Sequence, residues 1–337
     1  MSNKMISTYA VNEAGGKFEV FEYDPGELGP GEVEIEVSSC GICHSDLSMI
    51  DNEWGQTRYP LVPGHEVVGT VSAIGSAVSN IQPGQNVGLG WHASYCNHCA
   101  PCGVGDHNLC AQAQPTIVGR HGGFADRVRA DANSVVLIPD GLPLDTAGPL
   151  FCAGITVFNP LVEFALAPTA KVGVIGIGGL GHLALQFLHA WGCEVTAFTS
   201  SESKAKEAQQ LGAHRAINSR EAQEIKQAAN SFDLVISTVN VKLDWNLYLN
   251  TLKPRGRLHF VGATLEPLDI NVFSMLGKQR SVSASPVGSP ATMAKMLEFA
   301  RLHGITPKVE TFRFSDINAA VDRLRSGDAH YRIVLEH

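Results

Sequence analysis

The stretch from Val172 to Gly181 limits the possible folds of this chain more than any other part of the sequence. It is an apolar run rich in Val and Ile that ends in the glycine pattern G-x-G-x-x-G, formed by Gly176, Gly178 and Gly181. A helical pattern begins inside the glycines, with apolar residues at Leu180, Leu183, Ala184, Phe187 and Leu188. A strand, a tight turn and a helix in this order are typical of a dinucleotide-binding βαβ unit.

Each glycine of this motif has its own physical role. Gly176 permits the turn, Gly178 lets a pyrophosphate approach the backbone, and Gly181 lets the helix pack closely on the strand. The phosphate then lies at the helix N-terminus, where free N–H groups and the helix dipole favour an anion. The remaining residues of the turn that we expect to contact the cofactor are Ile177, Gly179 and Leu180.

The composition is that of a soluble globular protein of two-domain size. The chain has 337 residues, of which 44% are hydrophobic and 17% charged, so two domains can each bury a core. Its net charge of −8 gives no reason to expect nucleic acid as a partner. The first sixteen residues lack a signal-peptide core, and His182 and Gln186 disfavour a glycine-interrupted membrane span. We therefore expect a cytoplasmic protein with no membrane partner.

Two kinds of sequence pattern divide the chain. Up to about residue 149, short alternating strands are separated by Pro-Gly turns, and little helical periodicity is present. Residues 150–285 alternate strands with helices, which predicts a doubly wound parallel sheet. The six strands expected there are 171–175, 194–198, 215–217, 233–237, 257–261 and 282–285. Residues 286–337 change pattern again, and we assign them to the first, β-rich domain together with residues 1–149.

Four closely spaced cysteines form the strongest local signal for a metal. Cys96, Cys99, Cys102 and Cys110 lie within fifteen residues of a loop. Four thiolates can bind Zn²⁺ tetrahedrally, and a site with all four positions filled leaves no room for substrate, so we expect a structural zinc. A disulfide or a redox-active C-x-x-C pair is the alternative, which a reducing compartment disfavours.

A second set of possible metal ligands is dispersed along the sequence. Cys43, His65 and Cys152 each have an ordinary explanation when taken singly, as a small buried thiol or a turn histidine. Together they make a Cys-His-Cys set, which leaves the open coordination position that a catalytic zinc requires. Asp46 could orient the imidazole of His65. Cys40 lies outside both sets, and so does Cys193.

These motifs make the chain resemble the zinc-dependent medium-chain alcohol dehydrogenases, and most closely their cinnamyl-alcohol-dehydrogenase-like branch. The resemblance covers nearly the full length. It is carried by the segments 41–46 (GICHSD), 63–67 (PGHEV), 152–156 (CAGIT) and 176–182 (GIGGLGH), and by the four-cysteine loop. It implies a GroES-like catalytic domain interrupted by a Rossmann domain, with two Zn²⁺ per chain. It also implies a homodimer formed through an edge of the Rossmann sheet.

The resemblance assigns roles to individual residues. Cys43, His65 and Cys152 are expected to bind the catalytic zinc, with Glu66 as an alternate ligand. Ser45 is expected to hydrogen-bond the substrate oxygen and to pass on a proton. Other residues expected in the active site or against the cofactor are His44, Asp46, Thr156, Thr238 and Gly262.

One position departs from the family pattern. The family usually has a histidine three residues after Ser45, where it ends a proton relay, and this chain has Ser48 there. A hydroxyl does not act as an acid or base near neutral pH as imidazole does. We therefore expect protons to leave through water or through His44.

The segment after the second strand of the dinucleotide domain predicts the choice of cofactor. An NAD enzyme places an acid there, and that acid would repel a 2′-phosphate. Here Ser200 stands in its place, and Lys204 supplies a positive charge for the phosphate of NADP(H). Glu202 is the counter-evidence, but we expect it to point to solvent at a helix start. The hydroxyls expected at the phosphate are Thr199, Ser200 and Ser201.

The sequence thus predicts an NADP(H)-dependent zinc alcohol dehydrogenase that works mainly as an aldehyde reductase on small alcohols and aldehydes, aromatic or aliphatic. Trp54 and Trp91 are candidates for the substrate pocket, although a large aromatic is more often part of a core. An NAD-dependent alcohol or polyol dehydrogenase is the first alternative. A zinc-containing scaffold that binds a dinucleotide without catalysis is an alternative of another class.

Overall fold

A computed structural model of the protein describes residues 5–337. By contacts the described chain forms two compact units, residues 5–155 with 287–337 and residues 156–286. The predicted start of the second unit, residue 150, lies six residues earlier, and its predicted end, residue 285, lies one residue earlier. The helix α4 (Ala153–Glu163) runs across the first division, so the end of one unit and the start of the next share one element.

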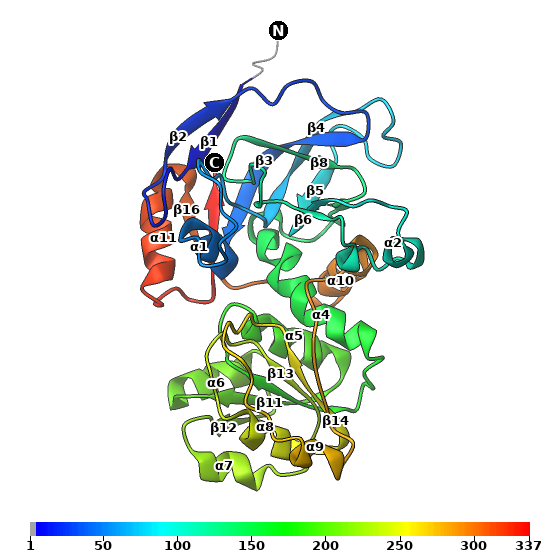
Figure 1. Ribbon diagram of the computed structural model, residues 1–337, viewed down its shortest axis with the longest axis vertical. Coiled ribbons are helices and arrows are strands. Elements are labelled where there is room, and N and C mark those ends of the chain that lie inside the picture. The colour runs from blue at the N-terminus through cyan, green and yellow to red at the C-terminus, as the bar shows by residue number, and fades with distance from the viewer. Residues whose placement is uncertain (1–4) are drawn as a thin grey trace. The chain divides into compact units, whose positions relative to one another are not determined.

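A seven-stranded sheet forms the core of the first unit (Figure 1). Its strands follow the order β16-β17-β3-β4-β5-β9, and β8 pairs with β3. Side chains alternate between the two faces of a strand, and on β3 Val33, Ile35 and Val37 are buried. The strands are β3 (Glu32–Ile42), β4 (Val67–Ile74), β5 (Asn86–Leu89), β8 (Arg127–Asp131), β9 (Val135–Leu137), β16 (Val309–Arg313) and β17 (Arg332–Glu336).

Smaller elements of the first unit surround this sheet. Two further strand pairs are β1 (Ile6–Ala10) with β2 (Glu19–Tyr23) and β6 (His92–Ser94) with β7 (Gln114–Pro115). The helices are α1 (His44–Ile50), α2 (Ala100–Val104), α3 (Leu144–Ala147), α10 (Pro290–His303) and α11 (Ile317–Arg325), with short 3₁₀ turns η1 (His107–Leu109), η2 (Gly148–Phe151) and η3 (Phe314–Asp316).

The sequence analysis did not detect α1. This helix has only seven residues, and its last five are all buried, so its sequence shows no alternation between an apolar and a polar face.

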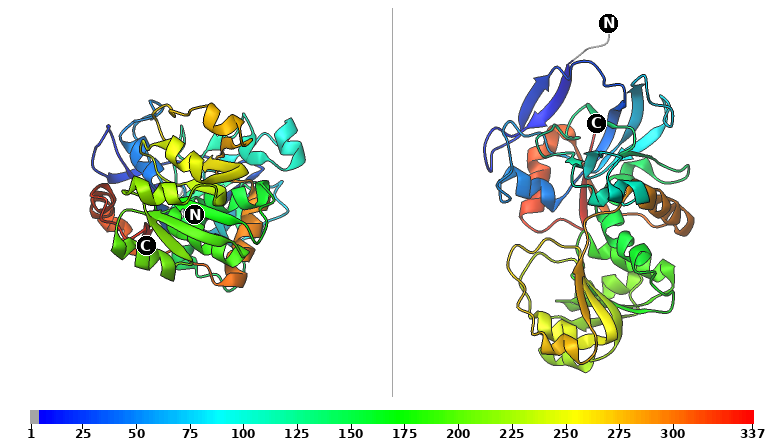
Figure 2. Two further views of the ribbon diagram at one scale, coloured as in Figure 1. Left: turned by 90° about the horizontal axis from the view of Figure 1, so that it is seen from below. Right: turned by 45° about the vertical axis from the view of Figure 1, so that its right-hand side comes forward.

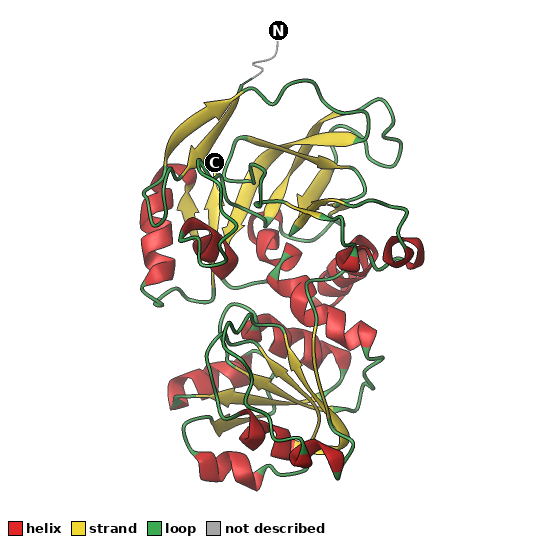
Figure 3. Ribbon diagram, in the orientation of Figure 1, coloured by secondary structure: helices red, strands yellow, loops and turns green. Residues whose placement is uncertain are grey.

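The second unit is a six-stranded parallel sheet in the order β12-β11-β10-β13-β14-β15. Numbered along the domain, this order is 3-2-1-4-5-6, which confirms the predicted doubly wound sheet. Helices cover the sheet, and Figures 2 and 3 show their alternation with the strands. The strands are β10 (Lys171–Ile175), β11 (Glu194–Thr199), β12 (Arg215–Asn218), β13 (Phe232–Ser237), β14 (Leu252–Phe260) and β15 (Ser281–Ala284).

The helices of the second unit follow the strands in sequence. They are the end of α4, then α5 (Gly181–Trp191), α6 (Glu202–Gln210), α7 (Ala222–Gln227), α8 (Trp245–Thr251) and α9 (Phe273–Leu276). Across residues 5–337, every helix is too short or too polar to cross a lipid bilayer.

Candidate active site

Asp46 organises the start of α1 in the first unit. Strand β3 ends at Ile42, and Cys43 is the N-cap residue of the helix. The Asp46 carboxylate accepts hydrogen bonds from the backbone N–H groups of Cys43, at 2.8 Å, and of Gly64, at 2.9 Å. An acid in the first turn also suits the helix dipole. The carboxylate thereby ties the helix start to the loop before His65.

Asp46 also orients His65, as we predicted from the sequence. Its Oδ1 atom lies 3.0 Å from His65 Nδ1, and both residues are completely buried. The other ring nitrogen, Nε2, is buried without a hydrogen-bond partner in the part of the chain that the structure describes. Because buried polar atoms normally have partners, an unpartnered Nε2 indicates a place for a metal ion.

The dispersed ligands converge. The Sγ atoms of Cys43 and Cys152 are 3.9 Å apart, although the residues are 109 positions apart in the sequence. One ligand atom from each of Cys43, His65, Glu66 and Cys152 lies within 4.8 Å of all the others. A tetrahedral zinc with bonds of about 2.0 to 2.3 Å needs ligand atoms at such separations. The donor set therefore fits zinc.

The surroundings favour the thiolate form of Cys43. The hydrogen bond with Cys152 lowers the pKa of the Cys43 thiol well below its ordinary value, against the opposite effect of burial, and Arg332 and His65 add to the lowering. The thiolate is the form that binds metal.

Arg332 is a residue beside the cluster that sequence reasoning missed. It is buried at the start of β17 and forms an ion pair with Glu66 Oε1, while Glu66 Oε2 has no partner within residues 5–337. Sheet register explains the contact, because β17 and β4 pair with neighbouring parts of β3. Gly41 on β3 leaves the room, since a Cβ atom there would overlap Glu66 Oε2. An arginine in an otherwise apolar closing strand was the available signal.

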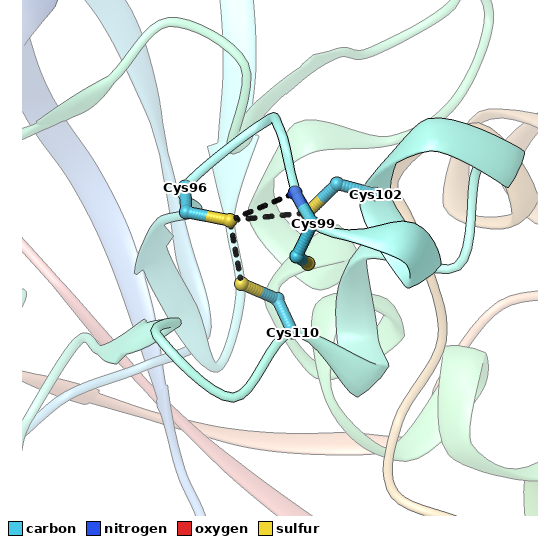
Figure 4. A group of neighbouring side chains, drawn as sticks. All are labelled: Cys96, Cys99, Cys102 and Cys110. Atoms are coloured by element: carbon cyan, nitrogen blue, oxygen red, sulfur yellow. Dashed lines mark hydrogen bonds between the residues drawn. The ribbon is translucent and has the colours of Figure 1, made fainter.

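The four-cysteine group is also assembled, around α2 and η1 (Figure 4). The Cys96 sulfur lies 3.5 Å from that of Cys110 and 4.0 Å from that of Cys102. These distances exceed a disulfide bond of about 2.05 Å, and all four cysteines are free thiols, so the disulfide alternative does not describe this structure. The group fits a closed tetrahedral site.

Of the predicted pocket tryptophans, Trp91 lies beside His65 and Trp54 lies beside Trp91. The Trp91 ring meets the His65 imidazole edge to face at 5.1 Å, and Trp54 meets Trp91 in the same way at 6.0 Å. Both tryptophans are partly buried and also pack against the core of the first unit. Ser45 Oγ lies 3.8 Å from Cys43 Sγ, whereas His44 is exposed at the start of α1.

The glycine turn of the second unit has the geometry that the motif predicts. Gly176 has a φ angle of +85°, a conformation that L side chains rarely adopt. A Cβ atom at Gly181 would overlap the Gly176 carbonyl oxygen, whereas one at Gly178 would meet nothing within 4 Å. The space at Gly178 fits the approach of a phosphate. Ile177, Gly179 and Leu180 complete the turn into α5.

Thr238 and Gly262, both expected to contact the cofactor, also stabilise the backbone around the glycine turn. The Thr238 hydroxyl donates to the carbonyl oxygens of Ile175, at 3.0 Å, and Gly176, at 2.8 Å, so it holds the turn in place. Gly262 allows a close approach to the backbone of Val239. Thr156 is buried in α4. Their contacts with a cofactor stay predictions.

The segment expected to select the cofactor connects β11 with α6. Ser201 is the N-cap of α6, and its hydroxyl accepts the Lys204 N–H at 3.3 Å. Glu202 is exposed and pairs with Lys206 at 3.2 Å, which confirms that it points to solvent. The Lys204 side chain is exposed and has no ion pair with a described acid.

Unpartnered hydroxyls mark the carboxyl edge of the parallel sheet. Within the described residues, the hydroxyls of Thr199, Ser237 and Thr264 are buried without hydrogen-bond partners. Thr199 ends β11, Ser237 ends β13, and Thr264 follows β14. Ligands of doubly wound sheets bind at this edge. Ser237 and Thr264 were not predicted; their positions, at the end of one apolar strand and shortly after another, were the available signal.

A dinucleotide-binding sheet in one unit and a buried Cys-His-Cys cluster in the other define a zinc-containing dehydrogenase. The family described as "Alcohol dehydrogenase GroES-like domain" matches residues 29–140, and "Zinc-binding dehydrogenase" matches residues 179–301. The chain belongs to the zinc-dependent medium-chain alcohol dehydrogenases, in their cinnamyl-alcohol-dehydrogenase-like branch.

Relatives match over nearly the whole chain. The aldehyde reductase AdhA of Synechocystis is 64% identical over 99% of both chains. Cinnamyl alcohol dehydrogenase 7 of Arabidopsis thaliana is 38% identical over 97% of this chain and 94% of its own. The solved cinnamyl alcohol dehydrogenase SbCAD4 of Sorghum bicolor superposes with a TM-score of 0.94, at 37% identity, over 99% of this chain and 98% of its own.

A solved structure with a bound cofactor is also similar to this chain. The CAD of Helicobacter pylori, solved in complex with NADP(H), has a TM-score of 0.91 and 29% identity, and the match covers 98% of each chain.

Proposed function

We propose that this protein is an NADP(H)-dependent zinc alcohol dehydrogenase that works mainly as an aldehyde reductase on small aromatic or aliphatic substrates. The observation that carries the proposal is the convergence of Cys43, His65 and Cys152, with His65 Nε2 buried and without a hydrogen-bond partner among the described residues. Three protein ligands leave a fourth position for substrate oxygen. The name of the Synechocystis aldehyde reductase supports aldehyde reduction as the main direction of the reaction. The NADP(H) complex of the Helicobacter CAD supports NADP(H) as the cofactor.

The metal, the cofactor and the protein side chains each have a different role in the proposed reaction. Bound zinc supplies a Lewis acid for the carbonyl oxygen, and NADPH supplies the hydride. Asp46 fixes the tautomer of His65, so that Nε2 keeps its lone pair free. Ser45, close to Cys43, donates a hydrogen bond and then a proton to the substrate oxygen. Trp91 and Trp54 offer an aromatic wall against which a substrate can pack.

The second zinc has a structural role in this proposal. Cys96, Cys99, Cys102 and Cys110 fill all four positions, so no substrate can bind there. Two zinc ions per chain are therefore expected, one at each cysteine group.

NADP(H) is favoured over NAD(H) by the segment after β11. Ser200 stands where an NAD-binding acid is expected, and Lys204 is exposed with no acid paired to it in the described chain. A carboxylate at position 200 would instead favour the NAD-dependent alternative. The non-catalytic scaffold is disfavoured because a scaffold has no need for an open metal position.

We also propose that the protein is cytoplasmic and forms a homodimer. Eight free cysteines suit a reducing compartment, which supports the cytoplasm. Exposed apolar side chains in the segment between β14 and β15 support a homodimer, because large exposed apolar groups mark protein interfaces. They include Leu265, Val272, Phe273 and Leu276, which are 69%, 56%, 84% and 63% exposed.

A substrate panel tests the function directly. Aromatic, aliphatic and polyol substrates are assayed with both NADPH and NADH, in both directions. We expect the highest kcat/KM for an aldehyde with NADPH. A higher value for a polyol with NAD supports the first alternative, and no turnover with bound cofactor supports the scaffold.

A further inference from the structure

His182 follows the last glycine of the turn, and its polar imidazole is completely buried in the first turn of α5. Its Nδ1 atom lies 3.2 Å from the carbonyl oxygen of Gly178, and its backbone N–H donates to the same oxygen at 3.0 Å. Because a carbonyl oxygen only accepts hydrogen bonds, Nδ1 carries the hydrogen in this contact. One residue therefore donates twice to a single carbonyl group of the glycine turn.

This double contact fixes the direction of the peptide group between Gly178 and Gly179. In a trans peptide the N–H and the C=O point in opposite directions. With the Gly178 oxygen turned towards His182, the Gly179 N–H points away from the body of the helix. Among residues 5–337, no hydrogen-bond acceptor is paired with this N–H. It is thus free to donate to an anion at the N-terminus of α5.

A peptide between two glycines needs such a restraint. Glycine adopts positive and negative φ angles about equally readily, so this peptide can turn over at little steric cost. A Cβ atom at Gly178 would meet nothing within 4 Å, so close packing does not hold the backbone there. Turned over, the peptide would direct a carbonyl oxygen instead of an N–H towards a phosphate. The apparent affinity for the phosphate falls with the fraction of molecules in that state.

The beginning of the turn is held in a similar way. The Thr238 hydroxyl donates to the carbonyl oxygen of Gly176 at 2.8 Å. The carbonyl groups of Gly176 and Gly178 are therefore each held by a side chain, one from the residue after β13 and one from α5. The sequence motif shows the glycines but does not show these two restraints.

We infer that His182 is a positioning residue for the pyrophosphate of the dinucleotide and that it acts through the Gly178 carbonyl group. The inference rests on the proposed function, because it takes the glycine turn as the site of that pyrophosphate. The imidazole N–H keeps the peptide in the orientation that presents the Gly179 N–H. Its hydrogen bond also polarises the peptide and strengthens that N–H as a donor. NADPH and NADH share the pyrophosphate, so the inference does not depend on the choice between them.

The alternative is that His182 only fills the core and stabilises the first turn of α5. His182→Leu removes the donor, and His182→Phe removes it but keeps a flat ring. His182→Asn keeps an N–H donor near the position of Nδ1. His259→Leu is the matched control, because His259 is also completely buried in the second unit and hydrogen-bonds Ser283 and Ser285 instead of the turn.

The experiment measures the Kd of NADPH by fluorescence titration, together with kcat, KM and melting temperature. It also measures the affinity for adenosine 2′-monophosphate, which carries the 2′-phosphate but lacks the pyrophosphate, by competition with NADPH. We expect His182→Leu and His182→Phe to raise the Kd and the KM of NADPH about three- to tenfold, the size of one hydrogen bond. Their kcat at saturating NADPH and their affinity for adenosine 2′-monophosphate should match the wild type.

The other two variants test whether the donor itself matters. His182→Asn should bind NADPH like the wild type, because the donor is kept. His259→Leu should also do so, even where its melting temperature falls. A purely structural role for His182 would instead weaken both ligands together, in step with the loss of stability.

Several outcomes overturn the inference. One is an unchanged Kd of NADPH in folded His182→Leu, and another is an equal loss of affinity for adenosine 2′-monophosphate. Failure of both His182→Leu and His182→Phe to fold makes His182 a folding residue. A wild-type protein that binds NADPH but reduces no aldehyde overturns the proposed function alone, since the inference is tested by binding. A wild-type protein that binds neither NADPH nor NADH overturns both.

Discussion

At the scale of single residues, each cysteine group has a different consequence for metal content. Cys43→Ser should abolish turnover and remove about one zinc ion, because the catalytic group loses a ligand. Cys99→Ser should chiefly lower the yield of folded protein, because metal binding in a closed site is coupled to folding. Elemental analysis and thermal melting check both variants.

Cys193→Ser is the control, since Cys193 is a buried thiol outside both metal groups. It should keep two zinc ions per chain. A purified wild-type protein that holds a single zinc would contradict the assignment of both sites.

Cofactor choice is also decided by single side chains. Lys204→Ala should lower kcat/KM with NADPH ten- to a hundredfold and leave the value with NADH nearly unchanged, because a hydrogen bond to a charged group contributes about 1.5 to 3 kcal/mol. Ser200→Asp should reverse the preference by repelling the 2′-phosphate. Steady-state kinetics with both cofactors give the ratios.

Lys206→Ala is the matched control on the same helix, because Lys206 is exposed and pairs with Glu202. It should change neither ratio. Equal efficiency of the wild type with NADH and NADPH would show that the segment does not select NADP(H).

At the scale of an element, two glycines of the turn between β10 and α5 have different roles, one in folding and one in cofactor binding. Gly181→Ala should lower the melting temperature, because the added methyl group overlaps the Gly176 carbonyl oxygen. Gly178→Ala should fold normally, since its Cβ would meet no atom within 4 Å, yet bind NADPH more weakly by occupying the space for the phosphate.

Thermal melting and fluorescence titration with NADPH measure the two effects. Gly103→Ala, at another glycine where a Cβ would meet nothing within 4 Å, is the control and should change neither. Undiminished NADPH affinity in Gly178→Ala would argue against a phosphate at this turn.

At the scale of the whole molecule, the apolar side chains of α9 bear on assembly. Phe273→Ser with Leu276→Ser should weaken the proposed homodimer, because these side chains are 84% and 63% exposed in the single chain. Light scattering coupled to size-exclusion chromatography measures the mass. Leu302→Ser, at an exposed leucine of the first unit, is the control. A wild-type protein that is monomeric at micromolar concentration would exclude the dimer.

Features encoded within a few residues could be predicted from the sequence. The glycine turn depends on backbone conformation and spacing within ten residues, and Gly176, Gly178 and Gly181 have the predicted geometry. Four cysteines within fifteen residues can be brought together by local turns alone. The alternation of strands and helices likewise predicted the parallel sheet. Cys43, His65 and Cys152 were grouped by their chemistry and by family resemblance, since their spacing alone does not bring them together.

Tertiary structure decided the contacts between distant parts of the chain. Arg332 reaches Glu66 across 266 residues because β17 and β4 pair with neighbouring parts of β3, and sheet register of this kind has no local signature. Helix α1 is stabilised by the burial of its side chains in the tertiary structure. Its seven residues show no amphipathic pattern from which the helix could be predicted. The hydrogen bond from the Ser48 hydroxyl to Glu53 Oε2 spans only five residues, yet it depends on how the segment after α1 folds back against the helix, which packing with α11 and the core decides.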